Sequence, residues 1–314
     1  MVWNMTSLYY FRRFIYIYPM KAVVYYISLP LIYLFVIIPF PFFYVLSDLA
    51  FFLLYHVLGY RKKVVMQNLE NAFPEKSEKE LKKIAKGFYR FLCDLFLETF
   101  KTLVISRSSA LKHCKMDTEA KVLFDRYYHE NKSIIVVMGH FGNWEWAGNT
   151  FSLLCKHQLY VIYHPLSNKN FNSLMYKVRT RFGTKLIDMK EAFKDMVKNK
   201  NEINVTAFIA DQTPSPENAY WTTFLNQDTP IFRGTEKIAR KMNCPVVYVS
   251  MKRKKRGYYE ISAKTLFEEP KNTAEGEISE AHTRQLEADI LLQPETWLWS
   301  HRRWKHKRSA SIPV

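Results

Sequence analysis

The chain has 314 residues, of which 48% are hydrophobic and 16% aromatic, and it carries a formal net charge of +17. This length is enough for one large domain or for two. The positive charge favours an anionic partner, such as lipid head groups, a phosphorylated substrate, an acidic carrier protein or nucleic acid. The four cysteines are far apart and form no CxxC pair, which argues against a disulfide framework and against a zinc site.

The first predicted element is an apolar segment near the N-terminus. No charged residue occurs between Lys21 and Asp48, and about 20 apolar residues suffice to span a bilayer. Pro30, Pro39 and Pro41 break any single straight helix. A kinked span, a re-entrant hairpin, an interfacial segment and a buried core hairpin are therefore all consistent with the pattern. The run is too long for a signal peptide and has no evident cleavage site.

Basic residues flank this apolar segment on both sides: Arg12, Arg13 and Lys21 before it, and Arg61, Lys62 and Lys63 after it. The larger excess of positive charge lies on the C-terminal side. The positive-inside rule therefore places the main part of the chain on the cytoplasmic face of the inner (plasma) membrane. We predict a membrane anchor over residues 1–63 and a catalytic domain over residues 64–314.

A long amphipathic helix is predicted over residues 78–104. Ser77 and Glu80 form a capping box at its start, and apolar residues recur at helical spacing along it. Glu98 and Lys101 lie on the same helix, three residues apart, and we expect them to form a solvated pair.

From about residue 120 the predicted elements alternate between strand and helix. Strands are expected at 133–138, 159–163, 203–210, 245–251 and 258–264, and helices at 143–156, 171–182, 190–199, 234–243 and 277–292. This alternation predicts an α/β fold with a mostly parallel sheet flanked by helices. The basic run Lys252–Arg256 lies between two of the strands, where we expect a solvated hairpin.

The most informative motif is Gly139-His140-Phe-Gly142-Asn143-Trp-Glu145, directly after the strand at 133–138. A histidine in such a turn can act as a base at neutral pH, and a nearby carboxylate can hold its other ring nitrogen. This requires His140 in the turn and Glu145 in the following helix, because five residues of one helix would point the two side chains apart. Unpaired N–H groups around Gly142 and Asn143 offer an oxyanion site. The alternative is a structural histidine beside a solvated glutamate.

Two further pairs of residues are candidates for binding the substrate. Arg179 and Arg181 lie near a predicted helix end, where they either bind a phosphate or form a solvated cationic terminus. Asp211 and Gln212 follow a predicted strand, at the end where α/β sheets place their ligands.

The C-terminal segment interleaves tryptophans with cations, among them Arg302 and Arg303. Such a segment suits a membrane interface or a phosphate-binding rim. A nucleic-acid partner would explain the cations but not the apolar N-terminus, so no nucleic acid is expected. His301 is an alternative base, although it lacks the glycine-bracketed strand end.

The motif at 139–145 resembles the catalytic motif of the glycerolipid acyltransferase superfamily, and its longer form is similar to that of the late lipid A biosynthesis acyltransferases. Other elements resemble this family in the expected order: Asn68-Leu69, Phe73-Pro74-Glu75, Arg179-x-Arg181-Phe-Gly183, Asp211-Gln212 and Trp297-x-Trp299-x-His301-Arg-Arg-Trp304-Lys305. The chain departs from the family around Phe224-Leu225-Asn226, where an aromatic residue and a glycine are more usual.

The resemblance implies the acyltransferase α/β fold with an N-terminal membrane anchor. It implies transfer of a fatty acyl group from acyl-acyl carrier protein, a co-substrate, to a hydroxyl of a phosphorylated lipid A precursor at an anionic membrane surface. His140 would be the general base and Glu145 its partner, with Gly142 and Asn143 at the oxyanion. The substrate-binding residues would be Arg179, Arg181, Asp211, Gln212, Arg302 and Arg303. The resemblance implies no metal and no cofactor.

Three alternatives stay open. The first is an acyltransferase for another lipid, such as a lysophospholipid, an aminolipid or a glycolipid. The second is a metal-dependent hydrolase using His140 and Glu145, although no third ligand occurs at a convincing spacing. The third is a membrane protein that binds anionic lipid without catalysis, for which replacing His140 would change nothing measurable.

Overall fold

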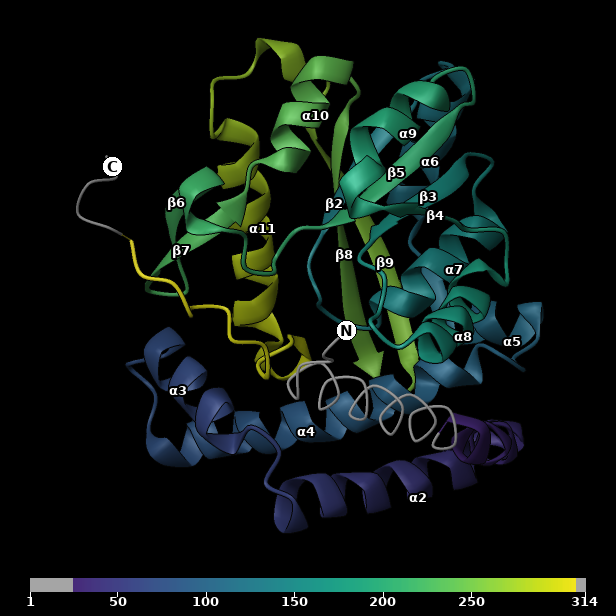
Figure 1. The fold of residues 1–314 in the computed structure, drawn as a ribbon, viewed down its shortest axis with the longest axis vertical. Helices are drawn as coiled ribbons and strands as arrows, with labels where there is room; N and C mark the ends of the chain where they lie inside the picture. Colours follow the sequence, from purple (N-terminus) through teal and green to yellow (C-terminus); the bar gives the residue numbers. More distant parts are fainter. Residues whose placement is uncertain (1–24, 309–314) are drawn as a thin grey trace, which may run out of the picture.

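A computed structural model describes residues 25–308. The basic residues Arg12, Arg13 and Lys21 and the start of the apolar run lie outside the described residues. The centre of the fold is a seven-stranded sheet in the order β1-β9-β8-β2-β5-β3-β4, beside a two-stranded β6-β7 hairpin. Figure 1 shows this sheet above a group of N-terminal helices.

The strands have the following bounds: β1 Cys114–Met116, β2 Ile134–Met138, β3 Gln158–Tyr163, β4 Lys185–Asp188, β5 Asn204–Ile209, β6 Ala219–Phe224, β7 Gln227–Phe232, β8 Val246–Lys255 and β9 Tyr258–Phe267. Strands β8, β2, β5, β3 and β4 run parallel to one another, and only the β8–β9 pair in this sheet is antiparallel. The predicted mostly parallel sheet is confirmed. Strands β1, β4, β6 and β7 were not expected from the sequence.

The α-helices with described bounds are α2 Phe40–Phe51, α3 Lys62–Ala72, α4 Glu78–Lys101, α5 Arg107–His113, α6 Thr118–His129, α7 Trp144–Leu154, α8 Lys169–Thr180, α9 Ala192–Lys198, α10 Gly234–Met242 and α11 Glu277–Leu292. A short π-helix, η1, spans Phe52–Val57, and 3-10 turns occupy Met189–Glu191, Pro216–Asn218, Pro270–Asn272 and Pro294–Thr296. The capping box of Ser77 and Glu80 opens α4 as predicted.

Helices cover both faces of the sheet, and β2 shows why. Its five residues are all buried, and side chains along a strand alternate between faces. Ile134 and Val136 pack with α6 and α7, whereas Ile135 and Val137 pack with α9, α10 and α11. Because both faces of β2 are buried, every residue of the strand is apolar, and the sequence of β2 is a continuous apolar run.

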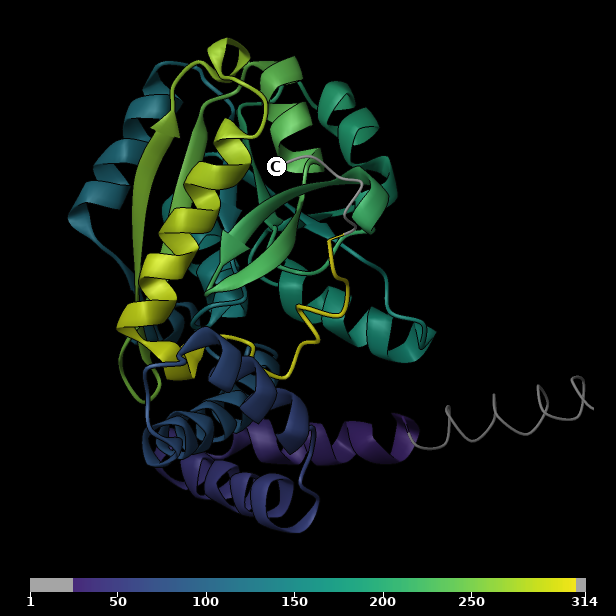
Figure 2. The same cartoon turned by 90° about the vertical axis from the view of Figure 1, so that its left-hand side faces the viewer.

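The apolar N-terminal run is not one straight helix. Helical structure covers Tyr25–Ile37, breaks at Ile38 and Pro39, and resumes as α2. Figures 1 and 2 show that these two helices run in different directions at the same end of the molecule, beside α4. The segment Phe40–Val57 is long and apolar enough to cross a membrane, by length and composition only. The predicted division at residue 63 stays a prediction.

The expected solvated pair on α4 is wrong. Glu98 is fully buried and Lys101 nearly so, because both face the N-terminal helices. The Lys101 ammonium donates to the carbonyls of Val36 and Ile38 at 2.5 and 2.7 Å. Lys101 thereby caps the end of the first apolar helix where Pro39 interrupts it.

The basic β8–β9 hairpin is also less solvated than expected. Arg253 and Arg256 both donate to Asp94 of α4, which is fully buried, and Arg256 also pairs with Asp48 of α2. These cations connect the sheet to the N-terminal helices, since they neutralise a carboxylate that would otherwise be buried unpaired.

Candidate active site

The turn at Gly139–Asn143 connects β2 to α7, as the sequence predicts. Gly142 has φ of +62°, and a Cβ atom there would collide with the Met251 carbonyl, so the position requires glycine. Phe141 forms an isolated bridge to Trp297. Asn143 caps α7, with its side-chain oxygen accepting from the Trp146 N–H at 3.0 Å. The three residues that follow His140 are therefore each held in place.

Asp211 holds His140 in place. The His140 Nδ1 lies 2.6 Å from one carboxylate oxygen of Asp211, and the His140 backbone N–H donates to the other at 2.9 Å. The Trp297 indole also donates to Asp211, at 2.8 Å. The predicted contact between His140 and Glu145 is wrong in this structure, because Asp211 occupies the Nδ1 position that Glu145 was expected to fill.

The electrostatics of this pair suit a general base. Burial alone would raise the pKa of Asp211, but the adjacent His140 ring, the His140 N–H and the Trp297 indole together lower it to about 2. Asp211 is therefore a carboxylate that accepts the Nδ1 proton, which leaves Nε2 of the neutral ring as an acceptor. The Gln212 side-chain nitrogen lies 3.3 Å from this Nε2.

Glu145 pairs with Arg179 instead. The Arg179 guanidinium donates to both Glu145 oxygens, with the shortest distance at 2.6 Å. This bidentate geometry joins the first turn of α7 to α8. Both residues line the same large cavity as His140, so the two sequence candidates lie together in the site without Glu145 touching the histidine.

The large cavity has a volume of about 660 Å³. His140, Trp144, Glu145, Arg179 and Gln212 line it together with apolar side chains from β3, β4, β5 and α10. A mostly apolar cleft with a few convergent polar groups is the usual form of a small-molecule site. The cavity therefore combines polar groups that could take part in a reaction with apolar walls that suit a hydrocarbon chain.

Three other predicted binding residues lie elsewhere. Arg181 donates to the Thr102 carbonyl, and Arg302 is exposed on the C-terminal segment. Arg303 is 1% exposed and donates to the Pro230 carbonyl at 2.7 Å. None of the three lines the large cavity, which departs from the expectation that they contact the substrate there.

The predicted oxyanion donors also need revision. The Gly142 N–H donates to the Thr296 carbonyl at 3.0 Å, so it is not free to bind an oxyanion in this geometry. The Asn143 side-chain nitrogen donates to Glu98 at 2.7 Å. A role for the Asn143 backbone N–H stays a prediction.

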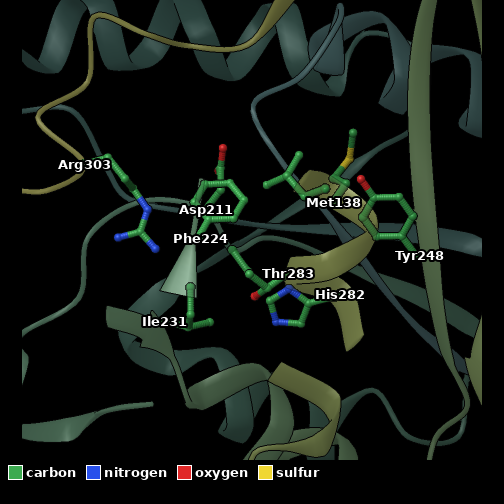
Figure 3. A pocket seen from close by; sticks show the side chains of 10 residues that line it. Met138, Asp211, Phe224, Ile231, Tyr248, His282, Thr283 and Arg303 are labelled. Atoms are coloured by element: carbon green, nitrogen blue, oxygen red, sulfur yellow. The ribbon is translucent and has the colours of Figure 1, made fainter. Parts of the chain in front are cut away.

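A second, much smaller space lies at Asp211 and holds about 10 Å³, room for one water at most. Figure 3 shows Asp211, His282 and Arg303 among the side chains around it. Burial lowers the pKa of His282 to about 4 and that of Arg303 to about 10, with Asp211 opposing both shifts. Nε2 of His282 and Nε and Nη1 of Arg303 have no hydrogen-bond partner among the described residues.

The tryptophan-rich C-terminus was assigned to a membrane interface or a phosphate-binding rim, and the structure corrects this. Trp297 and Trp299 are almost completely buried, and Trp297 is a partner of Asp211. His301, the alternative base, lies 3.3 Å from the Thr213 hydroxyl through Nε2, and burial lowers its pKa to about 4. The contribution of Glu98 was also missed, since an isolated glutamate on an amphipathic helix gives no signal of burial.

The chain resembles known proteins over most of its length. Residues 16–306 match the family of bacterial lipid A biosynthesis acyltransferases, and the chain belongs to this family. It is 24% identical over 250 residues to the lipid A biosynthesis palmitoleoyltransferase of Escherichia coli (strain K12), covering 78% of this chain and 79% of the relative. It is equally similar to a lipid A biosynthesis acyltransferase of Shigella flexneri. The lipid A biosynthesis lauroyltransferase of Escherichia coli (strain K12) is 25% identical over 264 residues, 81% of each chain. The protein is an acyltransferase of lipid A biosynthesis.

Proposed function

We propose that the protein transfers a fatty acyl group from acyl-acyl carrier protein to a hydroxyl of a phosphorylated lipid A precursor, with His140 as the general base. The observation that carries this proposal is His140, which lines the 660 Å³ cavity and is held at Nδ1 by Asp211 behind it. A base held by a buried carboxylate, next to a cavity with apolar walls, is what acyl transfer from a thioester to a lipid hydroxyl requires.

The chemistry follows from these positions. Nε2 of His140 takes the proton of the acceptor hydroxyl as its oxygen attacks the thioester carbonyl. Asp211 stabilises the imidazolium that forms. The tetrahedral intermediate then collapses, the C–S bond breaks, and the imidazolium returns the proton to the leaving thiolate. The products are an ester and the free thiol of the carrier, with His140 neutral again.

Glu145 and Arg179 act as a pair in this proposal. Arg179 binds the acceptor near its phosphate or sugar, and Glu145 fixes the guanidinium through its two hydrogen bonds. Gln212 lies beside Nε2 and positions the incoming hydroxyl. The chain's charge of +17 also favours an acidic carrier protein and an anionic membrane.

We place the protein on the cytoplasmic face of the inner membrane. Large apolar side chains are exposed along the two N-terminal helices and the π-helix, among them Ile27, Leu34, Ile37, Phe42, Val45, Leu49, Phe52 and Val57. Monomeric soluble proteins rarely expose so continuous an apolar surface. The exposed cations Arg61, Lys63 and Arg90 follow or adjoin this surface and suit anionic head groups.

A transfer assay tests the proposal. Purified membranes containing the protein are incubated with a radiolabelled tetra-acylated lipid A precursor and a panel of acyl-carrier donors. We expect a faster-migrating product with one donor, and its loss in H140A. No product with any donor, together with unchanged lipid A in a deletion strain, would contradict lipid A as acceptor. Lysophospholipid, aminolipid and glycolipid acceptors would then be tested in the same assay.

A further inference from the structure

Glu98 is, besides Asp211, a second buried carboxylate that contacts the catalytic turn. It lies in the middle of α4, is fully buried, and accepts three side-chain hydrogen bonds. Tyr44 donates at 2.8 Å, Asn143 at 2.7 Å and Tyr259 at 2.7 Å. Burial, and the nearby Asp94, raise the pKa of Glu98. A buried carboxylate is costly unless donors of this kind compensate it.

One of these three contacts, that of Asn143, reaches the catalytic turn. Asn143 uses both ends of its side-chain amide, because its nitrogen donates to Glu98 and its oxygen accepts from the Trp146 N–H. The Trp146 indole donates in turn to the backbone carbonyl of Glu98 at 3.0 Å. The first turn of α7 is thus fixed to α4, and Asn143 is only three residues from His140.

Another of the three contacts, that of Tyr44, comes from the apolar helix α2. The Tyr44 hydroxyl packs directly against the backbone of Gly257 in the β8–β9 turn, where a Cβ atom would collide with it. One turn further along α2, Ser47 donates to Asp94 at 2.6 Å. Apolar side chains alone could pack α2 against α4, and they would avoid the desolvation penalty of burying Asp94 and Glu98. Buried polar groups of this kind are best known for selecting one arrangement of the elements they join.

We propose that Glu98 is a positioning residue for the transfer reaction, which ties the catalytic turn to the apolar helix α2. The chain Tyr44–Glu98–Asn143 fixes where α7 begins, and the start of α7 fixes the turn that carries His140. His140 is then correctly positioned only when α2 is packed against α4. This role of α2 is separate from any part it has in membrane attachment. This inference rests on the proposed acyl transfer for its kinetic test only.

Two pairs of variants test it. E98Q keeps the shape of the side chain but turns one accepting oxygen into a donor facing Asn143 or Tyr44. We expect kcat to fall about 10- to 100-fold, with KM for both substrates nearly unchanged, because misplacing a base affects the chemical step. In E98Q/N143D the polarity of the bond is reversed, so the new amide donates to the new carboxylate. We expect part of the lost kcat to return.

Y44F and Y259F form the second pair. Each removes one hydroxyl from the same carboxylate, but only Tyr44 lies on α2. We expect Y44F to lower kcat more than Y259F does, and to increase amide hydrogen exchange in residues 139–147 relative to Y259F. This exchange measurement does not depend on activity, so it tests the inference even with no substrate in hand.

The outcomes separate the two proposals. A wild-type protein without transfer activity contradicts the proposed function and leaves the exchange comparison to decide about Glu98. An active wild type with E98Q at full kcat and only a lower melting temperature makes Glu98 purely structural and overturns the inference. Equal effects of Y44F and Y259F on both kcat and exchange would show that the contact with α2 has no special part in positioning the turn, and would also overturn the inference.

Discussion

The two carboxylates near His140 have different surroundings, and this predicts different kinetic effects. D211N retains the shape of Asp211 but can donate to Nδ1, which favours the wrong tautomer of the ring. We expect kcat to fall by about 10²- to 10⁴-fold, as for the equivalent change in other histidine–carboxylate pairs. E145Q, the matched control, weakens the bond to Arg179 and should mainly raise KM for the acceptor. Initial rates over both substrate concentrations measure the two effects, and a larger kcat loss in E145Q would contradict this assignment.

The sequence alone could not show which of the two carboxylates, Asp211 or Glu145, bonds to the His140 ring. Met138 of β2 is paired with Ile209 of β5, and His140 and Asp211 each come two residues later. Adjacent parallel strands therefore place the two side chains opposite one another, although they are 71 residues apart. The sequence showed that both follow a strand, but not that these strands are neighbours. Glu145 is closer in sequence, yet it faces α8.

His282 predicts how stability depends on pH. Burial lowers its pKa to about 4, below the value of about 6.5 expected in an unfolded chain. As the pH falls from 6.5 toward 4, the unfolded state takes up a proton that the folded state does not, so stability is lost in this window. We expect the free energy of unfolding to fall by about 3 kcal/mol more in the wild type than in H282Q. Denaturant titrations at pH 7 and 4 measure this.

The exposed His129 supplies the control for that titration. H129Q should retain the full pH dependence of the wild type, because His129 lies on the surface at the end of α6. His301, whose pKa is also lowered to about 4, contributes equally to all three proteins. An identical loss of stability in H282Q and the wild type would show that His282 becomes protonated freely in the folded state.

At the scale of elements, Lys101 stabilises the break between the two apolar helices. K101M removes the ammonium from the carbonyls of Val36 and Ile38. Each buried acceptor left without a partner costs about 1–3 kcal/mol. We therefore expect K101M to lower the free energy of unfolding by about 2–4 kcal/mol, measured by denaturant titration in detergent. K83M changes an exposed lysine on the same helix and should be nearly neutral. Equal stability of the two variants would contradict the capping role.

Every strand and helix that the sequence predicts is present, but short strands, one hairpin and three helices were not predicted. The five predicted strands and six predicted helices all occur, with ends shifted by up to four residues. The three-residue β1, the four-residue β4, the hairpin Ala219–Phe232 and the helices α3, α5 and α6 were missed. A strand of three or four residues has too few positions to show an alternation. The hairpin turns at Leu225 and Asn226, both with positive φ, without the glycine that usually marks such a turn.

At the scale of the whole molecule, the exposed apolar surface predicts where the protein meets lipid. V45K introduces a charge on the outer face of α2, where Val45 is 64% exposed. If lipid covers Val45, replacing it loses about 1.5–3 kcal/mol of apolar burial. Binding to vesicles of phosphatidylethanolamine and phosphatidylglycerol should then weaken about tenfold or more. V122K is the matched control, since Val122 on α6 is 63% exposed. Cosedimentation measures both, and equal binding by the two variants would place the lipid contact elsewhere.

The contacts of α2 further predict that it lies along the membrane surface and does not span the bilayer. As a straight span, Phe40–Val57 would cover about 27 Å at 1.5 Å per residue, close to the hydrocarbon thickness. Its inner face, however, is bonded to Asp94 and Glu98 of α4, and carrying those buried charges into hydrocarbon is costly. Only the outer face is free to meet lipid.

Fluorescent labels on cysteines introduced at Phe42, Leu49 and Leu53 distinguish the two arrangements. These positions are all exposed and are spread along the segment, while the native Cys93 and Cys114 are buried. A helix lying in one leaflet puts all three labels at one shallow depth when lipid-borne quenchers are placed at different positions of the acyl chain. A spanning helix would give a depth that changes steadily along it, with one end reached by impermeant reagents from the far side. A label at Val122 should remain in water in either case, because α6 covers the opposite part of the molecule from α2.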